Sequence, residues 1–139
     1  MGALACLCIR YLFERGRFDL ALSMAATAES VCKNANLQDH GLLLADVYSV
    51  YGALYVELNR MEPATEQFDK ATAIREEAVV LGALEADHPN RANSYMNAGV
   101  SHTNSNTRKA IELHQQALKI RHSSDRFTIS RQVEFRSTT

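Results

Sequence analysis

Three stretches of the sequence place small and apolar residues at the same intervals. Within each stretch the intervals are four, three and three residues, and successive stretches begin 43 and 46 residues apart. The stretches are Ala21, Ala25, Ala28 and Val31; Ala64, Phe68, Ala71 and Ile74; and Ala110, His114, Ala117 and Ile120. These intervals put the residues of each stretch on one face of an α-helix. Because the face recurs at a nearly fixed period, the sequence predicts an array of similar helical units.

A second helical pattern precedes each stretch. It consists of Ala5, Cys8, Ile9 and Leu12 in the first unit; Tyr48, Tyr51, Gly52 and Tyr55 in the second; and Tyr95, Ala98, Gly99 and His102 in the third. Gly52 and Gly99 have no side chain, so the second helix of each unit can approach closely there. Ile9 stands where a small residue is expected, which predicts a weaker first unit or a wider helix spacing. Two connections, Gly16-Arg17-Phe18 and Asn59-Arg60-Met61, occupy the same offset in the first two units.

These two patterns together resemble the tetratricopeptide repeat. The 43- to 46-residue spacing agrees with the longer form of this repeat. A longer run looks like the repeat of kinesin light chains and is similar to the arrays of many fungal and bacterial signalling proteins: Leu81-Gly82…Asp87-His88-Pro89…Ala92…Asn97-Ala98-Gly99, ending with Ala117-Leu118-Lys119-Ile120-Arg121. The resemblance covers about residues 10–122. It implies an all-α fold, a right-handed superhelical stack of about three antiparallel helix pairs. The domain would span residues 1–122, with repeats at about 3–34, 42–80 and 89–122. The periodicity fails after Arg121, and residues 123–139 are interpreted as a tail, either disordered or a partial repeat, with disorder favoured by the composition.

Composition and charge restrict the partners. The net charge is −1, so no strong field would attract nucleic acid or an anionic membrane. The apolar N-terminus is short and interrupted by Arg10, so it would not span a bilayer, and the cytoplasm is the expected location. The three cysteines are an odd number in apolar stretches and are interpreted as small buried residues in a reducing compartment. We expect no metal and no cofactor.

No catalytic motif is present in the sequence. It contains no Gly-rich phosphate loop, no nucleophile elbow and no paired-histidine metal motif. The run Arg75-Glu76-Glu77 is interpreted as a solvated helix face, and the tyrosine stripe at positions 48, 51 and 55 as core. The sequence therefore favours a non-enzymatic protein–protein interaction module, a scaffold that binds a peptide segment.

The predicted binding surface is the concave groove that the first helix of each pair would line. The side chains expected to contact a peptide are Arg10, Asp46, Ser49, Asn93, Met96, Asn97 and Val100, and the same faces carry Cys6, Phe13, Val50, Ala53, Val56 and Asn104. The resemblance implies that Asn97 hydrogen-bonds the backbone of a bound peptide; Leu7 and Val50 occupy its position in the other repeats. Two further expectations are self-association through the apolar N-terminal helix and, as an alternative function, a role as a fragment of the sensor arm of a larger signalling ATPase.

Overall fold

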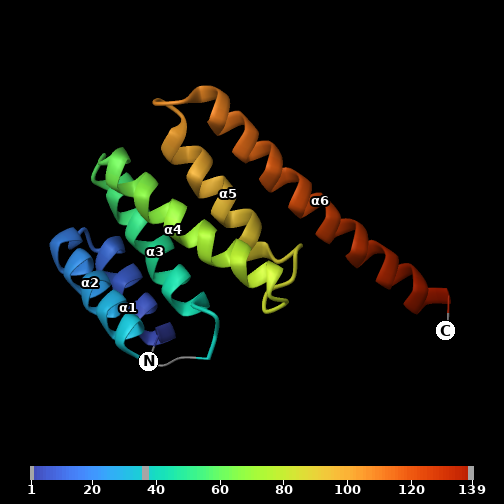
Figure 1. Cartoon of the computed structure of the whole chain (residues 1–139), viewed down its shortest axis with the longest axis horizontal. Helices are drawn as coiled ribbons and strands as arrows, with labels where there is room; N and C mark the ends of the chain where they lie inside the picture. Colours follow the sequence, from blue (N-terminus) through green and yellow to red (C-terminus); the bar gives the residue numbers. More distant parts are fainter. Residues whose placement is uncertain (1, 36–37, 138–139) are drawn as a thin grey trace.

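The computed structural model describes residues 2–35 and 38–137, with side chains from Leu7 to Ser124 apart from that gap. This part of the chain forms helices and no strands. The helices are α1 (Gly2–Glu14), α2 (Phe18–Asn34), α3 (Leu42–Glu57), α4 (Met61–Val80), α5 (Pro89–His102) and α6 (Thr107–Ser137). Each helix packs against the next one along the chain, and the first helices of successive pairs, α1, α3 and α5, also contact one another. The result is an α-solenoid of three helix pairs, which follow one another across the molecule in Figure 1 and confirm the predicted fold class.

The first two pairs turn in the same way. Gly16 and Asn59, which share a register position, both adopt a left-handed backbone, with φ of 72° and 58°. In each turn an amide N–H donates back across the turn at 2.8 Å, from Arg17 to the carbonyl of Leu12 and from Arg60 to the carbonyl of Tyr55. These bonds satisfy carbonyl groups that the helix end leaves open. The shared offset of the two connections in the sequence therefore corresponds to a shared turn.

The close approach predicted at the two glycines is present in the second and third pairs. A Cβ atom at Gly52 would lie 2.5 Å from the ring of Phe68, and one at Gly99 would lie 2.8 Å from the ring of His114. A real Cβ atom does not come this close to a neighbour, so both positions require glycine unless the ring moves. Phe68 and His114 thus occupy equivalent positions, each against the glycine of its own pair.

In the first pair, the large and the small residue at this helix contact change places. Ile9 replaces the glycine and is fully buried, in one cluster with Ala21, Ala25 and Leu54. Ala25 stands at the register position that Phe68 occupies in the second pair. A large residue on the first helix therefore meets a small one on the second helix, which keeps the interior filled.

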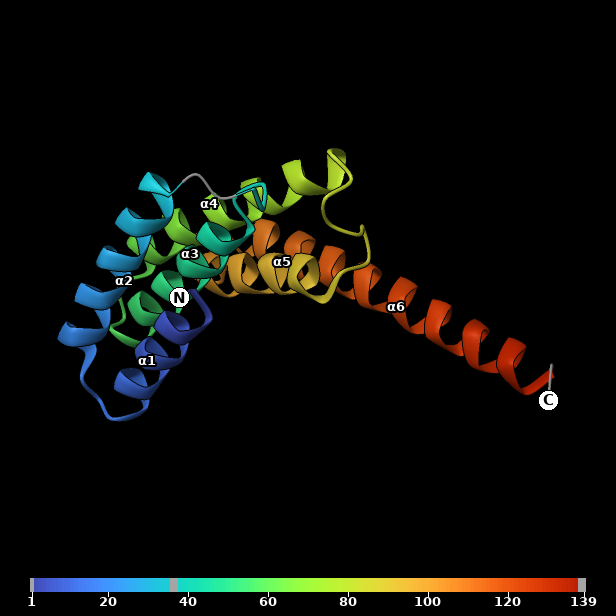
Figure 2. The same ribbon diagram turned by 90° about the horizontal axis from the view of Figure 1, so that it is seen from below.

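The last helix extends beyond the predicted repeat domain. The sequence favoured disorder for residues 123–139, but residues 123–137 continue α6, and this helix runs past the other helices toward the C-terminus in Figure 2. Residues 107–137 contain neither glycine nor proline, the two residues that most disfavour a helix interior, so the composition is compatible with this continuation. The other alternative, the start of a further repeat, stays a prediction, and residues 138 and 139 lie outside the described part.

Candidate interaction groove

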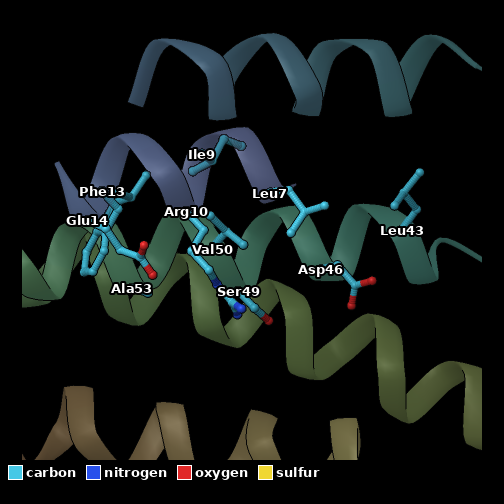
Figure 3. A pocket seen from close by; sticks show the side chains of 11 residues that line it. Leu7, Ile9, Arg10, Phe13, Glu14, Leu43, Asp46, Ser49, Val50 and Ala53 are labelled. Atoms are coloured by element: carbon cyan, nitrogen blue, oxygen red, sulfur yellow. The ribbon is translucent and has the colours of Figure 1, made fainter. Parts of the chain in front are cut away.

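A groove of about 790 Å³ runs between α1 and α3. Its walls consist of residues from these two helices: Leu7, Ile9, Arg10, Phe13, Glu14, Leu43, Asp46, Ser49, Val50, Ala53 and Leu54. Figure 3 shows Leu7, Leu43 and Asp46 toward one end of this groove and Phe13 and Glu14 toward the other, with Arg10 between them. We call this space the α1–α3 groove.

The apolar wall of the α1–α3 groove is continuous with the core. Phe13 and Val50 are half-buried and pack on the cluster around Ile9. The ring of Phe13 also meets Phe18 of α2 edge-on, with 5.7 Å between ring centroids. Edge-to-face pairs of this kind hold both rings in place. The groove therefore offers a supported apolar surface, with the exposed side chains of Arg10 and Glu14 at its rim.

A buried arginine lies beneath the polar side of this groove. Arg75 of α4 is only 4% exposed, so the interpretation of Arg75-Glu76-Glu77 as a solvated face is wrong at this residue. Its guanidinium donates to Asp46 Oδ1 at 2.8 Å, to Ser49 Oγ at 3.0 Å and to Ser94 Oγ at 2.7 Å. Asp46 and Ser49 belong to α3 and Ser94 to α5, so one side chain joins three helices of two successive pairs. We call this set the Arg75 junction.

The third pair repeats part of the Arg75 junction. Arg121 follows Arg75 by 46 residues, and its Nη2 donates to Asn93 Oδ1 at 3.1 Å and lies 3.9 Å from Met96 Sδ. Asn93 and Met96 occupy on α5 the register positions that Asp46 and Ser49 occupy on α3. Arg121 is exposed, and no helix of the described part covers it as α5 covers Arg75.

Three of the seven predicted binding residues line the α1–α3 groove, and the other four do not. Arg10, Asp46 and Ser49 line the α1–α3 groove, and two of these are already held by Arg75. The other four lie on α5, outside the lining of this groove: Asn93, Met96, Asn97 and Val100. Asn97 is half-buried and Val100 exposed. Their role in binding stays a prediction.

Sequence reasoning missed several groove residues. Leu43 and Glu14 were not expected in the lining, and Arg75 was not expected beneath it. A signal for Arg75 was present, because Arg75 and Arg121 recur at the same 46-residue interval as Ala64 and Ala110. A charged residue that repeats in register with core alanines indicates a shared structural role.

Three side chains with raised pKa values, Tyr48, Tyr95 and Arg91, lie where helices pack together. Burial is the main cause that raises the pKa of Tyr48 and Tyr95, and the carboxylates of Glu29 and Glu76 respectively raise it further. Arg91 donates from Nε to Glu76 Oε1 at 2.6 Å and from Nη2 to Glu76 Oε2 at 3.3 Å, and this pairing raises the pKa of Arg91.

Neither a cluster of metal-ligating side chains nor a membrane-spanning helix occurs among the described residues. Between Leu7 and Ser124, no three His, Cys, Asp or Glu side chains gather where they could hold a metal ion. Cys8 and Cys32 are half-buried free thiols, while the side chain of Cys6 lies outside the described part. Within the described ranges, none of the helices has the length and apolar character needed to cross a membrane.

Comparison with known proteins gives a structural likeness only. No protein-family model matches the chain, and no curated protein sequence matches it. Several solved structures do match, among them the crystal structure of BtubC (BKLC) from P. vanneervenii, with a TM-score of 0.73 at 20% sequence identity. The match covers 88% of this chain and 46% of the BtubC chain, so the chain spans less than half the length of that protein. At this identity the likeness shows the fold alone: the chain shares the all-helical α-solenoid fold of the BtubC structure.

Proposed function

We propose that this chain is a non-enzymatic protein-interaction module whose α1–α3 groove holds a peptide segment of a partner protein. The observation that supports the proposal is the groove itself, about 790 Å³ of open space with a largely apolar wall. This volume falls within the roughly 300–1,000 Å³ typical of ligand pockets. Arrays of helix pairs also commonly bind partners along the surface formed by their first helices.

The lining favours a peptide that carries one bulky apolar side chain. Leu7, Phe13 and Val50 would surround such a side chain and exclude water from it. Arg10 and Glu14 lie one helical turn apart at the rim, so they present a positive and a negative group to residues that flank the apolar one. Asp46 and Ser49 are engaged by Arg75 and would contribute remaining acceptor capacity.

The predicted residues of α5 would extend this surface. A peptide longer than the α1–α3 groove would continue from α3 to α5, because these helices are neighbours. There it would meet Asn93, Met96, Asn97 and Val100. The amide of Asn97 supplies both a donor and an acceptor, which suits an extended peptide backbone.

The test is a selection of peptides from a displayed library against the purified chain. Peptides that bind the wild type are then measured against two variants, Ala53→Glu and Ala73→Glu. Both alanines are exposed, but Ala53 lines the α1–α3 groove and Ala73 lies on the solvated side of α4. We expect Ala53→Glu to weaken binding at least tenfold and Ala73→Glu to leave it unchanged. Equal binding by both variants would place the site elsewhere.

The remaining expectations from the sequence stay predictions. They are a cytoplasmic location, the absence of nucleic-acid and membrane partners, and the alternative role within a signalling ATPase. No observation on the described residues favours that alternative over the interaction module.

A further inference from the structure

The two ends of the solenoid expose apolar side chains at positions that are covered inside it. Within the array, the second helix of each pair packs against the first helix of the next, as α2 does on α3 and α4 on α5. The same register positions at the two ends, on α6 and on α1, have no neighbouring helix in the structure.

The outer side of α6 corresponds to the side of α4 that meets α5. Glu76 marks this side of α4, because it pairs with Arg91 of α5. Thr72 lies one turn before Glu76 and is half-buried. The residue 46 positions after Thr72 is Leu118, which is 65% exposed. In the first pair the equivalent residue is Glu29, which accepts a hydrogen bond from Tyr48 of α3 at 3.4 Å. Leu118 therefore occupies a position where both α2 and α4 lie against the next pair.

Ile111 lies two turns before Leu118 on the same side of α6 and is exposed as well. The residue 46 positions before Ile111 is Thr65, which is half-buried on α4. The α6 end face, defined here by Ile111 and Leu118, is thus more apolar than the two threonine positions of α4 that it repeats.

The opposite end face lies on α1. Tyr11 shares its register position with Leu54 of α3 and Ser101 of α5, both of which are buried, but Tyr11 is 56% exposed. Leu54 packs with Ala21 and Ala25 of α2, which shows that the preceding second helix covers this position. Leu7 is exposed beside Tyr11, and an apolar recess of about 360 Å³ opens among Leu7, Cys8, Tyr11, Leu12 and Met24. We call Leu7, Tyr11 and this recess the α1 end face.

We propose that a second copy of this chain docks head to tail, with the α1 end face of one copy on the α6 end face of another. The contact continues the packing that joins α2 to α3 and α4 to α5 within one copy. Leu118 and Ile111 of one copy would enter the recess beside Leu7 and Tyr11 of the next. The two faces differ, so an assembly of any length keeps one free α1 end face and one free α6 end face, and it grows with concentration.

The test uses light scattering on size-separated samples of the whole chain over a range of concentrations. The wild type should exceed the mass of two 15.5 kDa copies as concentration rises. Leu118→Glu removes the α6 face and Tyr11→Glu removes the α1 face, so each variant alone should be a monomer. An equimolar mixture of the two variants should form a dimer, because each supplies the face that the other has lost. Val80→Glu, a change at an exposed apolar residue outside both faces, should behave as the wild type.

Three results would overturn the proposal. A wild type that stays monomeric at all concentrations would show that the end faces take another occupant or none. A Leu118→Glu variant that still dimerises, beside a monomeric Tyr11→Glu, would indicate pairing of two α1 faces. A mixture that stays monomeric would exclude head-to-tail docking. All three variants change exposed residues, and circular dichroism checks that their helices are retained.

Discussion

The Arg75 junction leads to an asymmetric prediction for two variants of one ion pair. The Arg75 side chain is 5% exposed, whereas that of Asp46 is 46% exposed. Removing Asp46 leaves a buried cation without its counter-charge. Removing Arg75 leaves a carboxylate that water already reaches. We therefore expect removal of Asp46, the more exposed residue, to destabilise the fold more than removal of Arg75.

The expected losses in the free energy of unfolding depend on the hydrogen-bond partners that remain in each variant. Loss of one partner of a buried ion pair costs about 3–5 kcal/mol when the other is left uncompensated. In Asp46→Ala the guanidinium keeps two hydroxyl acceptors, Ser49 and Ser94, and water can enter beside it, so about 2 kcal/mol is expected. In Arg75→Met the apolar stem stays and Ser94 still donates to the carbonyl of Asn90 at 3.0 Å. The expected cost is about 0–1 kcal/mol, since the carboxylate of Asp46 that is left behind is 46% exposed and stays hydrated.

The assay is urea unfolding followed by circular dichroism at neutral pH. The double variant Asp46→Ala, Arg75→Met should be no less stable than Asp46→Ala alone, because the orphaned charge is gone. Asn93→Ala provides the matched control: it removes the equivalent contact from the exposed Arg121 and should change stability by less than about 0.5 kcal/mol. The reasoning is refuted if Arg75→Met costs more than Asp46→Ala, or if Asp46→Ala costs no more than Asn93→Ala.

Three further predictions concern single contacts. Gly52→Ala should lower the free energy of unfolding by about 1–3 kcal/mol, because the new Cβ would lie 2.5 Å from the ring of Phe68. Adding Phe68→Leu should recover part of this loss. An unchanged urea midpoint for Gly52→Ala would contradict the prediction. Tyr48 and Tyr95 should ionise above the ordinary value of about 10 in an ultraviolet titration compared with Phe variants. Because the unfolded chain then loses these protons first, their contribution to stability should be complete below about pH 10 and should be lost as pH rises above it. Arg91→Met should cost at most about 1 kcal/mol in unfolding, since the pair with its α4 carboxylate is partly exposed, and a loss that exceeds 2 kcal/mol would be inconsistent with that view.

The sequence predicted the fold well because the fold depends on periodicity. Ala64, Phe68 and Ala71 mark a helix face by spacing alone, and Gly52 marks where a partner helix approaches. The Arg75 junction could not be predicted in this way. Its burial depends on three helices meeting at one point, and a charged residue beside two glutamates has the local appearance of a solvated surface.

The groove was predicted only in part for a related reason. Helix registers placed Arg10, Asp46 and Ser49 on the correct side of α1 and α3. The helix registers do not predict the distance between two helices, so they do not show where open space remains. That separation lies between α1 and α3, so the residues of α5 fell outside it, although their positions in the repeat are equivalent.

The first pair joins a large Ile9 to a small Ala25, and the second pair joins a small Gly52 to a large Phe68. This exchange of sizes also affects which helices can pair while the chain folds. Similar helix pairs along one chain can associate with the wrong partner while they fold. If α1 paired with α4, an isoleucine would meet a phenylalanine, and the two would not fit. If α2 took the place of α4 against Gly52, a glycine would meet an alanine, and a cavity would remain. The exchange of sizes therefore disfavours mismatched helix pairs relative to the native ones.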